Sequence, residues 1–215
     1  MTDIDEYDKM TVKTITVGTY ATNCYLLICK HTKKAIIIDP GFDHLKIIDE
    51  ITNLKIDPQL IILTHGHGDH IGAVKELKDK YNIPLGIHQA DSKMLNSAIL
   101  NFSPFILKRL LTLKADQILN DKDILKVGLL DVLVIHTPGH SKGSICLKCN
   151  QIMFSGDTLF HHGIGRTDLI GGSHLNILNS IKSKILIYND NVIVYPGHGP
   201  KTSIGEERKN NPYLD

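Results

Sequence analysis

Hydrophobic runs divide the chain into strands followed by helices. Strand-like runs occupy residues 11–17, 24–29 and 35–38, and turn residues separate them. Apolar positions then recur at helical spacing at Leu45, Ile48, Ile51 and Leu54, after Asp43, which is typical of a helix cap. The chain is therefore predicted to open as a meander of strands and to continue in an α/β order.

The same alternation of strand and helix continues to the end of the chain. Strands are predicted at residues 58–63, 84–88, 129–135, 143–147, 152–155 and 192–195, and helices at residues 71–81 and 174–187. Each half contains strands followed by a helix and a strand, which predicts a two-sheet sandwich with helices outside. Residues 89–114 fit less well, because Pro104 interrupts an apolar stretch that carries basic residues. We expect this stretch to be a lid or variable insertion over the core or a pocket.

Composition limits the class of protein and its partners. A chain of 215 residues with 42% hydrophobic content can bury a substantial core, and one domain over residues 1–215 is the simplest prediction. Lys and Arg number 24 against 23 Asp and Glu, so no strong field attracts nucleic acid or an anionic membrane. The acidic start resembles no secretion signal, and no apolar run could span a bilayer. We expect a cytoplasmic protein with a small-molecule partner.

The four cysteines are too few and too scattered for a disulfide framework, which agrees with a reducing compartment. Cys146 and Cys149 have the spacing of a redox or zinc pair. Residues three apart in a strand, however, project to opposite faces. The pattern therefore favours core or edge thiols over a redox centre.

Residues 64–70 carry the most informative motif of the sequence, directly after the apolar run of residues 61–63. His65 and His67 are two apart in an extended segment, point the same way and can share one metal ion. Asp69 and His70 follow at a strand-to-helix turn and can face another ion. One short segment therefore suggests two metals.

Three later segments each place a ligand-type residue after a glycine where the chain leaves a strand. They are residues 136–140, 154–158 and 195–199, and the candidate ligands are His140, Asp157 and His198. Together with the first motif they give a set of histidines and aspartates whose size matches two adjacent metals.

The ordered motifs resemble those of the metallo-β-lactamase fold and, within it, the glyoxalase II-like hydrolases. The resemblance spans nearly the whole chain and implies a four-layer αββα sandwich. It also implies the short single-domain form, without the carboxy-terminal helical domain that helps to bind glutathione in longer members. The residues that match family positions are, for the first ion, His65, His67 and His140; for the second ion, Asp69, His70 and His198; bridging both, Asp157; and behind the ligands, orienting one of them, Asp39.

The resemblance further implies hydrolysis by a hydroxide that bridges two divalent ions, zinc in preference to iron or manganese. The expected substrate is a small-molecule thioester such as S-lactoylglutathione. Asp69 and Asp157 would act in catalysis, Asp69 by handling protons as well as by ligation. Arg166 stands where the family places a lysine and an aromatic residue against glutathione, and could grip a substrate carboxylate. A salt bridge between Arg166 and Asp168 explains the same residues equally well.

Other functions remain open at this stage. Persulfide dioxygenases share the pattern, including the stretch at residues 165–168, and use one iron on positions that match His65, His140 and Asp157. A lactonase or β-lactamase side reaction is a weaker alternative. RNA-processing members need a basic surface, which the charge balance argues against, and a non-catalytic metal-binding or scaffold module would be expected to lack ligands. The apolar face of residues 94–113 could cover either a pocket or a neighbouring subunit, so a homo-oligomer is left open.

Overall fold

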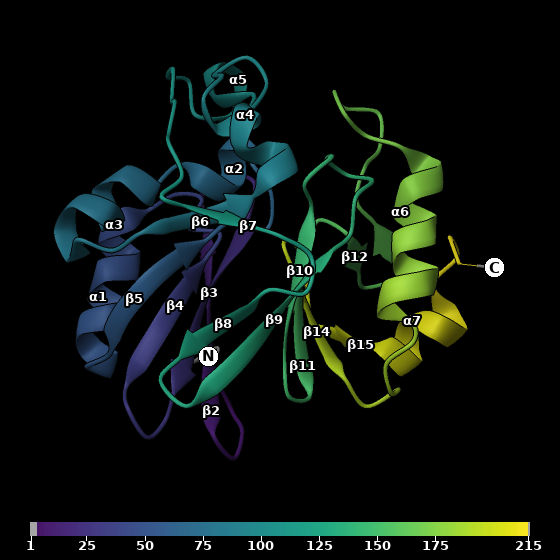
Figure 1. Ribbon diagram of the computed structural model, residues 1–215, viewed down its shortest axis with the longest axis horizontal. Coiled ribbons are helices and arrows are strands. Elements are labelled where there is room, and N and C mark those ends of the chain that lie inside the picture. Colours follow the sequence, from purple (N-terminus) through teal and green to yellow (C-terminus); the bar gives the residue numbers. More distant parts are fainter. Residues whose placement is uncertain (1–3, 215) are drawn as a thin grey trace.

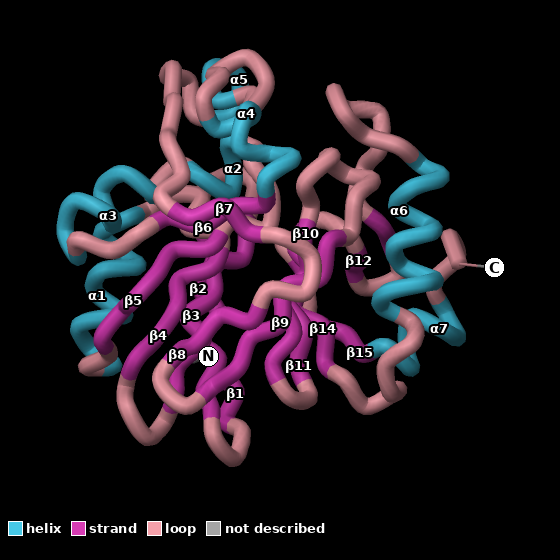
Figure 2. Tube along the Cα trace, viewed as in Figure 1, coloured by secondary structure: helices cyan, strands magenta, loops and turns pink. Residues whose placement is uncertain are grey.

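The computed structural model describes residues 4–214 as two packed sheets with helices on both outer sides (Figure 1). Figure 2 shows the strands gathered between the two groups of helices. This arrangement confirms the predicted four-layer αββα sandwich. Within the described residues, no helix has the length and apolar content needed to cross a membrane.

The first sheet runs in chain order from β1 to β7 and changes from antiparallel to parallel pairing at β4. Its strands are β1 (Ile4–Glu6), β2 (Met10–Val17), β3 (Thr22–Cys29), β4 (Lys34–Ile38), β5 (Asp57–Ile62), β6 (Leu85–His88) and β7 (Gln117–Leu119).

The second sheet has the strand order β15-β14-β11-β10-β9-β8, in which only β11 and β14 pair in parallel. Its strands are β8 (Ile124–Val127), β9 (Leu130–His136), β10 (Ile145–Cys149), β11 (Ile152–Gly156), β14 (Ile193–Pro196) and β15 (Thr202–Ser203). A separate small hairpin consists of β12 (Leu159–Phe160) and β13 (Gly163–Ile164).

The helices fall into three groups. Outside the first sheet lie α1 (His44–Leu54) and α3 (Val74–Tyr81). Outside the second sheet lie α6 (His174–Ser180), continued by the π-helical turn η2 (Ile181–Ile185), and α7 (Ile204–Asn210). At one end of the sandwich, uppermost in Figure 1, lie α2 (Gly68–Ile71), α4 (Ser92–Leu95) and α5 (Ser103–Ile106); the short 3-10 turn η1 (Gln89–Asp91) precedes α4.

Strand periodicity distributes one continuous apolar run between two cores. Ile36 and Ile38 of β4 face the space between the sheets, whereas Ile37 packs toward the outer helices. The inner core includes Phe154 and the outer one Ile47 of α1. Because both faces of the central strands are covered, these strands are apolar at nearly every position.

The predicted face of α1 was partly wrong. Ile47 and Ile51 are the buried residues of this helix, whereas Leu45 is 66% exposed. Asp43 stands at the start of the helix but makes no capping bond with its side chain, because its carboxylate accepts the backbone N–H of Gly18 instead. A bond to a distant turn has replaced the local cap that the sequence suggested.

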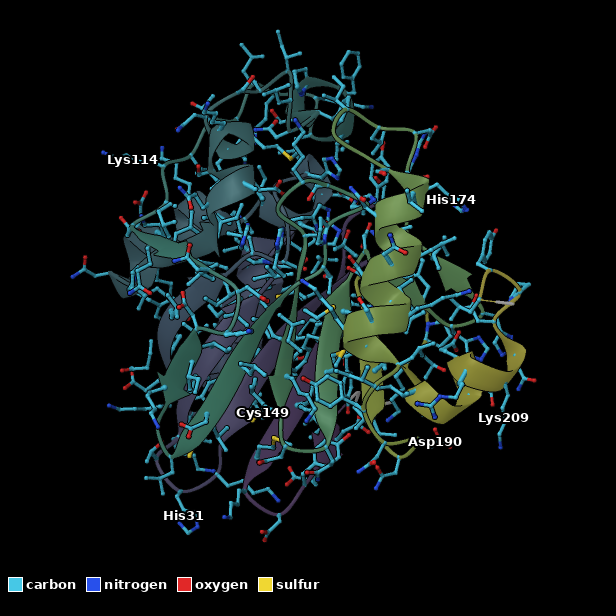
Figure 3. The ribbon with its side chains drawn as sticks, turned by 45° about the vertical axis from the view of Figure 1, so that its right-hand side comes forward. His31, Lys114, Cys149, His174, Asp190 and Lys209 are labelled. Carbon is cyan, nitrogen blue, oxygen red and sulfur yellow. The ribbon has the colours of Figure 1, made fainter. Side chains whose placement is uncertain are left out.

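The cysteines behave as the strand geometry predicted. Cys146 packs in the core between the second sheet and its helices, and Cys149 packs in the core between the sheets. Both thiols are free, and burial raises the pKa of each to about 11. Cys149 ends β10 and lies among the strands in the lower half of Figure 3. These properties fit core packing rather than redox chemistry.

The burial of Ile47 and the exposure of Leu45 in α1 can be tested by their effects on stability. Ile47→Ala should lower the free energy of unfolding by about 2–5 kcal/mol, because it leaves a cavity in a closed core. Leu45→Ala should change it by less than about 0.5 kcal/mol, because the side chain is largely in water. Urea denaturation at fixed metal concentration measures both. Equal losses in the two variants would mean that the helix presents a different face.

Candidate metal centre

Each candidate ligand follows the end of a strand, and the strand ends of both sheets meet at one end of the sandwich. Parallel strands β4 and β5 lead to residues 39 and 65–70, and parallel strands β11 and β14 lead to residues 157 and 198. Backbone bonds join the two sheets here: Ile145 N–H donates to Thr64 O, and Asn23 N–H donates to Gly197 O. Segments that are distant in sequence are thereby brought around one centre.

Three buried histidines form the first cluster. Nε2 of His140 lies 3.2 Å from Nε2 of His65 and 2.9 Å from Nδ1 of His67. The three ligand-type nitrogens could hold one metal ion, as the sequence predicted.

The second cluster contains three further predicted ligands, Asp69, His70 and His198. Nε2 of His198 lies 3.3 Å from both Nε2 of His70 and Oδ2 of Asp69. Asp157 stands between the clusters, with Oδ1 3.4 Å from His70 Nε2 and Oδ2 3.6 Å from Nε2 of both His140 and His198. One carboxylate therefore faces both groups.

Asp39 fixes two of the imidazoles from behind. Its carboxylate accepts the backbone N–H of Thr64 at 2.7 Å, the Thr64 hydroxyl at 2.6 Å and Nδ1–H of His70 at 3.0 Å. Because the Thr64 hydroxyl proton goes to Asp39, its oxygen accepts Nδ1–H of His65 at 3.1 Å. The proton of each ring is thus held on Nδ1, and both Nε2 lone pairs point inward.

Backbone carbonyls fix two further imidazoles. Nδ1–H of His140 donates to the carbonyl oxygen of Arg166 at 2.8 Å, and Nδ1–H of His198 donates to that of Tyr20 at 3.0 Å. A carbonyl can only accept, so Nε2 of each ring is unprotonated when the ring is neutral. In their neutral forms, the four imidazoles therefore turn bare nitrogens toward one another.

This arrangement fits bound cations. In the neutral tautomers described above, lone pairs face each other at 3.2 Å between His65 and His140 and at 3.3 Å between His70 and His198, and they repel unless a cation or a proton lies between them. His67 is the exception, because its Nδ1–H can donate to Nε2 of His140 at 2.9 Å. Nitrogens about 2.0–2.1 Å from one tetrahedral ion are roughly 3.3 Å apart, close to the separations here. Among the described residues, Oδ1 of Asp157 is also one of few buried side-chain atoms without a hydrogen-bond partner.

Burial and neighbouring charges shift histidine pKa values in opposite directions in the two clusters. Burial, reinforced by neighbouring imidazoles, lowers the pKa of His65 well below the usual value and that of His67 to about 3. Burial opposes a charge on His70 too, but Asp157, Asp69 and Asp39 outweigh it and raise its pKa to about 10. In the absence of an ion, a proton on His70 offsets part of the carboxylate charge, and a metal must displace that proton.

Gly197 permits the close packing of this centre. A Cβ at this position would collide with Oδ1 of Asp157 and lie 2.9 Å from Cε1 of His70. The turn before His198 therefore has room only for a hydrogen atom.

Two roles escaped the sequence analysis. Asp91 accepts Gly66 N–H and the Ser141 hydroxyl on Oδ2 and Gly143 N–H on Oδ1, and so ties the loops of the first cluster together. No local motif marks Asp91, because its partners lie 25 to 52 residues away. Arg166 contributes through its backbone oxygen, and its guanidinium pairs with Asp168, as the alternative interpretation predicted.

A cavity of about 650 Å³ opens onto both clusters. The lining includes His67, His140 and His198, Asp69 and Asp157, and a group of mainly apolar side chains. Residues 89–114, expected to be a lid or insertion, supply part of its wall through Phe102, Phe105 and Ile106.

Comparison with known proteins identifies the same architecture elsewhere. The family model of the metallo-beta-lactamase superfamily matches residues 17–198. Hydroxyacylglutathione hydrolase GloC of Haemophilus influenzae is 35% identical over 210 residues, which cover 96% of this chain and 99% of that protein.

Solved structures agree with the sequence comparison. The crystal structure of BLEG-1 B3 metallo-beta-lactamase has a TM-score of 0.90 and 41% identity, covering 94% of this chain and 99% of that one. TTHA1623 in a di-iron-bound form has a TM-score of 0.81 and 30% identity, with coverage of 94% and 99%.

The position of Asp39 behind His70 gives a test of the centre. In Asp39→Asn the amide N–H₂ must face either the backbone N–H of Thr64 or both the Thr64 hydroxyl and Nδ1–H of His70, and each orientation sets donor against donor. We expect metal affinity to fall by about 10–100-fold. Competition with a chromophoric chelator measures the affinity. Asp49→Asn, on the exposed side of α1, is the matched control and should bind metal normally. Unchanged affinity in Asp39→Asn would show that Asp39 does not orient His70.

Proposed function

The chain belongs to the metallo-beta-lactamase superfamily, and on this basis we propose that it is a metal-dependent hydrolase of thioesters with two divalent ions at its centre. The observation that carries the proposal is the pair of inward-facing nitrogen clusters with Asp157 between them. A single ion would leave one of these clusters without a cation.

We assign each cluster to one ion. His65, His67 and His140 would hold the first, Asp69, His70 and His198 the second, and Asp157 would contact both. Asp39 would keep His70 and, through Thr64, His65 in the required tautomers. Imidazole and carboxylate ligands suit zinc, iron and manganese, and we propose zinc first.

The proposed reaction is the hydrolysis of a thioester to a carboxylic acid and a thiol. A water oxygen bonds to the carbonyl carbon, the C–S bond breaks with its electron pair on sulfur, and a proton from water ends on the thiolate. Two bound divalent ions supply Lewis acidity, which lowers the pKa of a water molecule and polarises a carbonyl. Asp69, at the cavity surface and 3.3 Å from His198 Nε2, is placed to carry a proton away from the attacking water.

The relatives support this choice of substrate and metal number. GloC is a hydroxyacylglutathione hydrolase, and the esters that such a name describes are thioesters. TTHA1623 has the same fold and was crystallised in a di-iron-bound form. Because each alignment covers at least 94% of both proteins, these relatives are suitable guides to the choice of assay.

A persulfide dioxygenase with one iron is the second candidate. The three residues that this function would use, His65, His140 and Asp157, do lie together at the centre. The proximity of His198 to Asp69 and His70 favours the hydrolase, because a one-iron site has no use for a second cluster.

Metal analysis combined with two assays separates the candidates. The purified, metal-loaded protein should contain two metals per chain and reduce the absorbance of S-lactoylglutathione at its thioester band. One iron per chain together with oxygen uptake on glutathione persulfide would instead establish the dioxygenase. Intact thioesters at high protein concentration would reject the hydrolase.

Removal of the shared carboxylate provides a mutational test. Asp157→Ala should abolish thioester turnover and lower metal content, because both clusters lose a ligand at once. Elemental analysis and the thioester assay on the same preparation measure the two effects. Asp79→Ala, on the exposed surface of α3, should retain both properties. Retained activity in Asp157→Ala would contradict the proposed centre.

A further inference from the structure

The wall of the cavity beside the first cluster is apolar. Phe102, Phe105 and Ile106 line it, and the Phe102 ring centroid lies 5.6 Å from that of His67. Phe105 is 76% exposed, although it belongs to a short helix that could have turned it inward. Apolar side chains that are grouped and partly exposed to water at the edge of a candidate site are typical of a surface that a ligand covers.

Buried hydrogen bonds fix this wall against the metal loop. Gly68 N–H donates to Asn101 O at 2.7 Å, directly beside Asp69. The side chain of Asn101 donates to Leu111 O and accepts Ser103 N–H, so the turn before α5 is tied at both ends. The wall is therefore placed by the same loop that carries the ligands.

The opposite side of the cavity is apolar as well. Tyr20, Phe160, Ile164 and Leu169 line it. The Phe160 ring lies edge-on to His198, with 6.2 Å between centroids. A ligand that spans both clusters therefore meets aromatic or aliphatic side chains in both directions.

Positive charge in the cavity is already paired. Apart from histidines, Arg166 is the one cationic side chain among the described residues that line it. Its Nε and Nη2 donate to the two carboxylate oxygens of Asp168 at 2.8 and 2.7 Å. A bidentate pair of this kind uses the geometry that would otherwise recognise a substrate carboxylate.

We infer that the preferred substrate is a thioester that carries an alkyl or aryl group and no free carboxylate. The apolar group covers Phe102, Phe105 and Ile106 while the carbonyl lies at the metal centre. The two carboxylates of glutathione would face apolar side chains and Arg166, whose charge is already paired with Asp168. This inference rests on the proposed thioester hydrolysis and narrows its substrate class.

A matched set of substrates tests the inference. Lactoyl and phenylacetyl thioesters, each made with glutathione and with 2-phenylethanethiol, separate the two halves of the substrate. We expect kcat/KM to be about tenfold or more higher for the apolar thiol than for glutathione. Calorimetry with the corresponding thioethers, in which CH₂ replaces the carbonyl, gives the same ranking from binding alone.

Two variants and a control test which side chains set this substrate preference. Phe105→Ala should lower kcat/KM for the apolar thioesters by about tenfold and leave the glutathione thioesters nearly unchanged. Asp168→Asn frees Arg166 and should raise kcat/KM for the glutathione thioesters only. Leu110→Ala removes an equally exposed apolar side chain, 79% exposed, that does not line the cavity, and should change neither.

The outcomes distinguish this inference from the function on which it rests. Equal or better turnover and binding of the glutathione compounds, or no loss in Phe105→Ala, would overturn the apolar assignment while leaving a thioesterase. No turnover of any thioester, with the apolar thioethers still bound better, would reject the proposed reaction and support the apolar wall.

Discussion

The candidate metal centre depends on the oxygen atoms that stand behind its imidazoles. Asp39, Thr64 and the carbonyls of Tyr20 and Arg166 each accept one ring N–H, and this leaves the inner nitrogens bare. Without these acceptors, a buried histidine could turn over or exchange tautomers, and its lone pair would be lost to the centre. The chemistry of the site is thus set by hydrogen bonds that never touch an ion.

The candidate ligands could be picked out from sequence because each follows a strand that has a strong local signal. Apolar runs predict strand ends, and residues with metal-binding side chains after glycine mark the turns, as at His140 and His198. The acceptors behind them could not all be read in this way. The partners of Asp91 come from two loops distant from it in sequence, and only the packed sandwich brings those loops together.

Helix faces and short elements were less predictable than the strands. In α1, Leu45 and Ile47 are both apolar, and only the packing of the helix on the sheet decides that Ile47 is covered and Leu45 is not. The strands β12, β13 and β15 each have two residues, too few for a periodic pattern. The stretch around Pro104 proved to be an anchored wall in which the proline stands in the first turn of α5.

The bond from Gly68 to Asn101 joins the wall to the metal loop through main-chain atoms alone. A main-chain contact does not depend on which side chain occupies the neighbouring positions. Evolution can therefore exchange Phe102, Phe105 and Ile106 without rebuilding the catalytic apparatus. Selectivity can diverge rapidly among descendants of such a scaffold, and grafting of this segment between homologues offers a route to engineered specificity.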